Sequence, residues 1–195
     1  MDKNQRKMTV SLFANRQQAN STSHNVANQL AAVQSQIDVA TEQRPLRYGV
    51  EPVTLVAVSK RQPENKIDAA LEAGQRVFGE NRVQEAIQRW TDRRKVYSDL
   101  ILHLIGPLQT NKVADAVALF DVIEVVDREK LARAIAKEMA HQNRFLPCYV
   151  QVNTGEEPQK SGIWPEQLND FTQFCIDELE LPIIGLMCIP PVDEE

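Results

Sequence analysis

Short apolar runs alternate with longer amphipathic segments along most of the chain. The runs are rich in Val, Ile and Leu, have the length of buried strands, and begin at residues 53, 76, 101, 121, 147 and 182. Between them, apolar residues recur three or four positions apart, which predicts helices over 64–73, 83–93, 111–119, 128–141 and 165–179. Strands and helices in regular alternation predict an α/β fold with a parallel sheet.

The first fifty residues have a different pattern. Residues 1–22 are polar and aperiodic, which predicts a flexible arm. From Ser23, a fair N-cap, apolar residues return at spacings of three and four and predict an amphipathic helix. Because 195 residues suit one domain, or one domain plus an arm, we expect residues 23–195 to form a single domain.

Six strands fit two architectures. One is an open, doubly wound sheet; the other is a (β/α)₈ barrel, which needs eight strands and usually ~250 residues. The hydrophobic pattern alone favours the open sheet. In both architectures, ligands bind at the C-terminal ends of the strands, so the residues there are the first candidates for a site.

Composition and charge narrow the class of protein. The chain is 43% hydrophobic and 25% charged, as is usual for a soluble globular domain. Its net charge of −5 argues against a general nucleic-acid binder, and its three cysteines lack the spacing of a zinc site or a disulfide framework. No apolar run is long enough for a membrane span or a signal-peptide core. We therefore expect a cytoplasmic protein without a metal site.

Lys60 is the most specific chemical candidate. It closes the first apolar run, and a lysine at the end of a buried strand is desolvated, which lowers the pKa of its amine. A neutral amine is the form that makes a Schiff base with an aldehyde. The alternative is a solvated lysine at the start of a loop, and position alone favours that alternative.

Five segments resemble, in the same order, the pyridoxal phosphate homeostasis protein family. They are VTLVAVSK (53–60), RVFGENRVQEA (76–86), HLIGPLQTNK (103–112), VQVNTGEEPQKSG (150–162) and GLMCIPP (185–191). The resemblance covers residues 23–195 and implies the barrel of the alanine racemase N-terminal type, pyridoxal phosphate fold type III. It thus favours a (β/α)₈ TIM barrel over the open sheet, with about six of the eight strands in this chain and an N-terminal helix before them.

The resemblance also implies a cofactor, pyridoxal 5′-phosphate (PLP), held by Lys60 as a Schiff base. Asn81, His103 and Met187 match motif positions or a late strand near the mouth of the barrel, and are the other candidate cofactor-binding residues. No catalytic residue is expected. One departure is Leu102, where the family often has Trp.

The function implied is that of a carrier that buffers PLP and supplies it to apo-enzymes, as a monomer without turnover of its own. A racemase would need a second acid or base on the opposite face of the cofactor, usually a tyrosine. None of Tyr48, Tyr97 and Tyr149 lies at the C-terminal end of a predicted strand. Two alternatives remain open: a PLP-dependent amino-acid racemase or lyase, and a degenerate protein that binds nothing.

Family chains continue beyond the sixth strand with two further strands whose backbone and hydroxyl groups bind the phosphate. Nothing in this sequence matches that segment, so we expect a C-terminally truncated member. Such a chain would hold PLP weakly, and mainly through Lys60.

Overall fold

The computed structural model describes residues 3–45, 47, 49 and 51–190, with side chains from Ser23 onward. The chain forms two compact units, residues 1–76 and 77–195. Each unit is described by itself.

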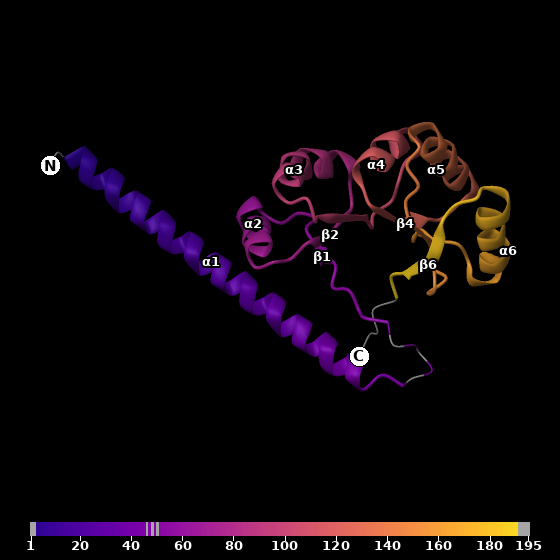
Figure 1. Ribbon diagram of the computed structural model, residues 1–195, viewed down its shortest axis with the longest axis horizontal. Coiled ribbons are helices and arrows are strands. Elements are labelled where there is room, and N and C mark those ends of the chain that lie inside the picture. Colours follow the sequence, from indigo (N-terminus) through magenta and orange to yellow (C-terminus); the bar gives the residue numbers. More distant parts are fainter. Residues whose placement is uncertain (1–2, 46, 48, 50, 191–195) are drawn as a thin grey trace. The chain divides into compact units, whose positions relative to one another are not determined.

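The first unit contains α1 (Lys3–Glu42), β1 (Ala57–Val58) and α2 (Glu64–Glu72) (Figure 1). Helix α1 begins well before Ser23, so residues 3–22, expected as an arm, are helical, and Ser23 is not a cap. The reason is that the sequence of α1 contains neither proline nor glycine, the two residues that end helices. The predicted domain of residues 23–195 stays a prediction.

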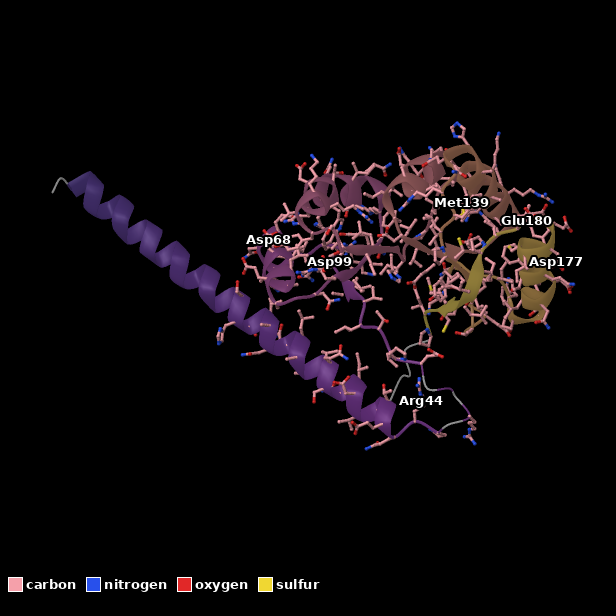
Figure 2. The ribbon with its side chains drawn as sticks, viewed as in Figure 1. Arg44, Asp68, Asp99, Met139, Asp177 and Glu180 are labelled. Carbon is pink, nitrogen blue, oxygen red and sulfur yellow. The ribbon has the colours of Figure 1, made fainter. Side chains whose placement is uncertain are left out.

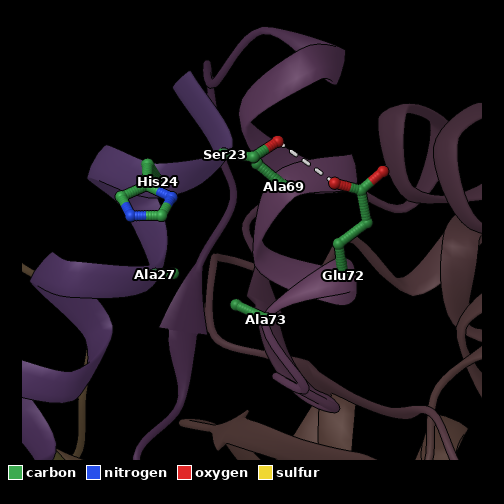
Figure 3. A pocket seen from close by; sticks show the side chains of 6 residues that line it. All are labelled: Ser23, His24, Ala27, Ala69, Glu72 and Ala73. Carbon is green, nitrogen blue, oxygen red and sulfur yellow. Dashed lines mark hydrogen bonds between the residues drawn. The ribbon is translucent and has the colours of Figure 1, made fainter. Parts of the chain in front are cut away.

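Small side chains line the contact between α1 and α2. Ser23 Oγ donates a hydrogen bond to Glu72 Oε2 at 3.1 Å, beside a shallow pocket of about 200 Å³ that His24 and the alanines around it line. Figure 3 shows the His24 ring on the far side of Ser23 from Glu72. The three polar residues therefore form no serine–histidine–carboxylate relay, and the pocket is a feature of helix packing.

Strand β1 is shorter than the apolar run that predicts it. The run begins at Val53, which is exposed, whereas the strand comprises only Ala57 and Val58. Before the strand, the carbonyl of Leu55 accepts a hydrogen bond from the side chain of Gln75 at 2.9 Å.

The second unit alternates strands and helices in the predicted order. Its elements are β2 (Val77–Glu80), α3 (Val83–Val96), β3 (Ile101–Leu104), α4 (Val113–Leu119), β4 (Val122–Val126), α5 (Glu129–Gln142), β5 (Cys148–Val152), α6 (Leu168–Gln173) and β6 (Ile183–Cys188). A 3₁₀ turn precedes α4 and another precedes α6, and one π-helical turn, Phe174–Glu178, follows α6. All five strands and all five helices predicted after residue 63 are confirmed within a few residues.

The strands of the second unit are parallel, and each pairs with the next one along the chain. The helices α3 to α6 follow one side of the strands (Figure 1). A sequential strand order is typical of a (β/α) barrel, whereas a doubly wound sheet reverses its order at a switch point. The open sheet is therefore wrong and the barrel type is confirmed, as an incomplete barrel: within the described residues, β6 pairs with β5 alone.

The core of the second unit lies between the strands and the helices, where side chains fill the space (Figure 2). Phe78 of β2 packs against Trp90 of α3 with ring centroids 4.7 Å apart. Phe78 pairs in register with Leu102, so Leu102 points to the same, helix-covered face. Since side chains alternate along a strand, the next residues, Gly79 and His103, belong to the opposite face.

None of the helices in the described part of the chain combines the length and the apolar character that crossing a membrane requires.

Candidate functional site

The uncovered face of the second unit's sheet carries polar side chains from neighbouring strands. His103 of β3 lies on it, by the alternation just described. On β6, Leu186 lines a groove against α6, so its neighbour Met187 points to the uncovered face. Met187 pairs in register with Gln151 of β5, which therefore lies on the same face.

Asn81 follows β2 directly, at the C-terminal end of the sheet, two residues beyond the partner of His103. Gly79 pairs with His103, and Asn81 comes two residues later, on the same face. The Oδ1 atom of Asn81 is buried and accepts no hydrogen bond within the described residues. A buried acceptor without a donor costs free energy, so this atom suits a ligand or water that donates an N–H or O–H.

A buried ion pair fixes the backbone just before Asn81. Glu80 is 0% exposed, and its Oε1 accepts hydrogen bonds from Arg89 Nη1 at 2.7 Å and from Trp90 Nε1 at 3.0 Å. Both donors belong to α3. These hydrogen bonds link the end of β2 to α3, and they thereby fix the backbone position at which Asn81 begins.

His103 is paired with a residue that the sequence did not single out. Its Nδ1 lies 2.5 Å from Glu124 Oε1 of β4, and the two side chains are 13% and 17% exposed. The signal in the sequence is a lone carboxylate inside the apolar run VIEVV, where a strand covered on both faces would carry another apolar residue.

Arg128, just after β4, pairs with its neighbour Asp127 and reaches the loop after β3 through a hydrogen bond. Arg128 Nη1 lies 2.5 Å from Asp127 Oδ1, and Arg128 Nη2 donates to the carbonyl of Leu108 at 2.9 Å. Burial raises the pKa of the Asp127 carboxyl above its ordinary value, and the charge of Arg128 opposes that rise. These contacts hold the loops at this end of the sheet in place.

Lys60 belongs to the first unit, two residues after β1. The strand-end position is as expected, but the burial is not: Lys60 is exposed, and Arg61 after it turns the chain with φ of 58°. Because β1 ends at Val58 and the chain turns at Arg61, the apolar residues of the run do not enclose the side chain of Lys60. Within the described residues its amine has no ion pair or hydrogen bond, so it is free to react.

The structure therefore places Asn81 directly after β2, His103 on the adjacent strand β3, and Glu124 in contact with His103. Met187 lies on the same face, three strands along. Among the residues that the structure covers, no three His, Cys, Asp or Glu side chains gather in a way that could hold a metal ion.

The sequence profile described as "Alanine racemase, N-terminal domain" matches residues 50–195. The pyridoxal phosphate homeostasis protein of Pasteurella multocida (strain Pm70) is 36% identical over 170 residues, which is 87% of this chain and 72% of that protein. The protein of the same name from Escherichia coli (strain K12) is 34% identical over 175 residues, 88% of this chain and 73% of that one.

This chain belongs to the pyridoxal phosphate homeostasis protein family. Among solved structures it resembles PipY of Synechococcus elongatus PCC7942, with 36% identity over 87% of this chain and 73% of that one and a TM-score of 0.73. A second PipY structure, with PLP bound, gives a TM-score of 0.71 over 72% of its chain. Alanine racemase from E. faecalis, at 18% identity and a TM-score of 0.56, shares the fold with this chain over 87% of this chain and 41% of its own length.

Proposed function

We propose that this chain binds PLP through Lys60 and serves as an intracellular carrier that buffers the cofactor. The observation that carries the proposal is the PLP-bound structure of PipY, a relative with 36% identity and the same fold over 87% of this chain. The names of the relatives support the same role. Supply of PLP to apo-enzymes, a cytoplasmic location and a monomeric state are parts of the proposal.

The residues present fit the aldehyde and the ring of PLP. The aldehyde requires an accessible primary amine, and Lys60 offers one that no carboxylate among the described residues pairs with. The ring carries polar groups, and the sheet of the second unit offers the buried Oδ1 of Asn81 and the partly buried imidazole of His103. Met187 adds an apolar side chain on the same face.

The bond to Lys60 forms without a further reactant. Lys60 would hold the cofactor through its neutral amine, by a condensation in which the carbonyl oxygen and the two amine hydrogens leave as one water, with no oxidant or reductant needed. PLP bound in this way supplies an electron sink for carbanions. Since water reverses the reaction, the bond both stores the aldehyde and releases it, as a buffer must.

We propose further that the chain does not turn over amino acids. Racemisation requires an acid or base on each face of the cofactor. Tyr149, the tyrosine on the sheet's uncovered face, pairs with Gly185 near the start of β5, away from the C-terminal end where ligands bind. The racemases among the solved structures share only the fold with this chain, so racemase activity is the second candidate and an outcome of the test below.

The proposal is tested by titrating the purified chain with PLP and following the absorbance of the Schiff base. We expect saturable binding in the wild type and in Lys112→Ala, and loss of the signal in Lys60→Ala. The loaded protein, freed of unbound PLP, should restore the activity of an apo-enzyme that depends on PLP. No binding would contradict the carrier role, and deuterium exchange into alanine at enzymic rates would favour the racemase.

A further inference from the structure

We propose that Glu124 is a positioning residue for His103 in the binding of PLP. This inference rests on the proposed function. It begins from the contact between the two side chains: His103 Nδ1 and Glu124 Oε1 are 2.5 Å apart, and both side chains are more than four-fifths buried. A charged carboxylate can only accept hydrogen bonds, so it keeps a proton on Nδ1 of the imidazole.

The backbone of β4 is irregular at Glu124. Ile123 pairs with Cys148 and Val126 with Val150, so β4 holds one residue more than β5 over this stretch. A β-bulge of this kind changes the direction of a side chain and is common beside functional sites. On β3, His103 pairs with Val122, and Glu124 follows two residues further on the same face. The two side chains therefore meet across adjacent strands.

The pair differs from a second histidine–carboxylate contact, which lies on α5. His141 Nδ1 lies 2.9 Å from Glu138 Oε1, three residues apart on α5, and the His141 side chain is 76% exposed. Such a contact on a helix surface contributes little, because water competes for both groups. The partly buried pair on the sheet, flanked on β4 by the fully buried Ile123 and Val125, holds its imidazole in one orientation.

With Nδ1 engaged by Glu124, Nε2 is the nitrogen of His103 that is left for a ligand. Within the described part of the chain, Nε2 forms no hydrogen bond. In the neutral imidazole it is an acceptor, as is Oδ1 of the neighbouring Asn81. The two acceptors suit the N–H and O–H groups of a protonated pyridine ring with a hydroxyl substituent.

The test compares Glu124→Gln with Glu138→Gln, a matched control at the exposed pair. Nitrogen NMR of the imidazoles should show the proton of His103 on Nδ1 in the wild type and in Glu138→Gln. In Glu124→Gln the amide can donate or accept, so we expect that preference to be lost. The dissociation constant for PLP should rise about threefold to tenfold, the equivalent of one hydrogen bond.

A double-mutant cycle separates positioning from a structural role. If Glu124 acts through His103, adding Glu124→Gln to His103→Gln should weaken PLP binding no further. If Glu124→Gln bound PLP as tightly as the wild type and kept the proton of His103 on Nδ1, this inference would be overturned and the proposed function would stand. A wild-type chain that binds no PLP would overturn the proposed function and this inference with it.

Discussion

Gly106 lies directly against the backbone of Asn81. A Cβ atom at position 106 would be 2.4 Å from the carbonyl oxygen of Asn81 and 2.5 Å from its Cα, closer than real side chains approach. The loop after β3 can therefore reach the loop after β2 only because residue 106 has no side chain. This contact, together with the buried Glu80, determines where Asn81 stands.

Replacing Gly106 by alanine should therefore move Asn81. We expect the free energy of unfolding to fall by about 1–3 kcal/mol, the usual cost of overpacking, and PLP affinity to fall with it. Urea denaturation and a PLP titration measure the two effects. The control is Gly74→Ala, where nothing lies within 4 Å of the new Cβ but φ is +94°. Because alanine is strained at that φ, this variant should lower the free energy of unfolding and leave PLP affinity unchanged. Wild-type stability and affinity in Gly106→Ala would contradict the account.

The ion pair between Glu80 and Arg89 should contribute strongly to stability, because the carboxylate is fully buried. Replacing Arg89 by methionine removes a cation from that carboxylate, and we expect a loss of about 3 kcal/mol in the free energy of unfolding. The control is Lys95→Met, in the exposed pair of Lys95 with Asp92, where no measurable change is expected. If Arg89→Met and Lys95→Met unfold at the same urea concentration, burial does not strengthen the contribution of the Glu80–Arg89 pair to stability.

The three thiols should differ in reactivity. Burial raises the pKa of Cys148 to about 12, with the nearby Cys175 adding to the rise, and raises the pKa of Cys175 to about 11; Cys188 is exposed. Since the thiolate is the reactive form, iodoacetamide at about pH 8 should modify Cys188 in the native protein and all three cysteines after unfolding. Cys188→Ser should abolish the native reaction, and native modification of Cys148 would contradict its burial.

The same shifts predict how stability depends on pH. Both thiols bind their protons more tightly in the folded state than in the unfolded one, whose pKa lies near 9. Their contribution to stability is therefore complete below about pH 9 and is lost as the pH rises through 11 to 12. Denaturation curves of Cys148→Ala should lack part of this alkaline loss, whereas those of Cys188→Ser should keep it.

Most elements of the second unit could be predicted because periodicity reports which face of each element is buried. The short apolar runs of the strands and the apolar spacing of α5 are local properties of the sequence. The strand order could not be predicted from the hydrophobic pattern, which favoured the open sheet. Only the resemblance to the family implied the barrel. The start of α1 was missed because polar residues form a helix as readily as a loose arm when no proline or glycine interrupts them.

The candidate site was harder to predict than the elements. Asn81 and His103 were named because they match motif positions of the family, and the strand pattern alone did not place them together. Glu124 was not singled out, although its contact with His103 follows from the register of the two strands: His103 pairs with Val122, and Glu124 lies two residues further on the same face. The exposure of Lys60 agrees with the alternative that position alone favoured, a solvated lysine at the start of a loop.

The central claim is that Lys60 carries PLP. Incubating the chain with PLP, reducing with borohydride, digesting and mapping the product by mass spectrometry tests it directly, because reduction makes the bond between lysine and cofactor permanent. The account predicts that the label falls on the peptide with Lys60 and disappears in Lys60→Ala. Label on Lys66, Lys112 or Lys160 that spares Lys60 would contradict it.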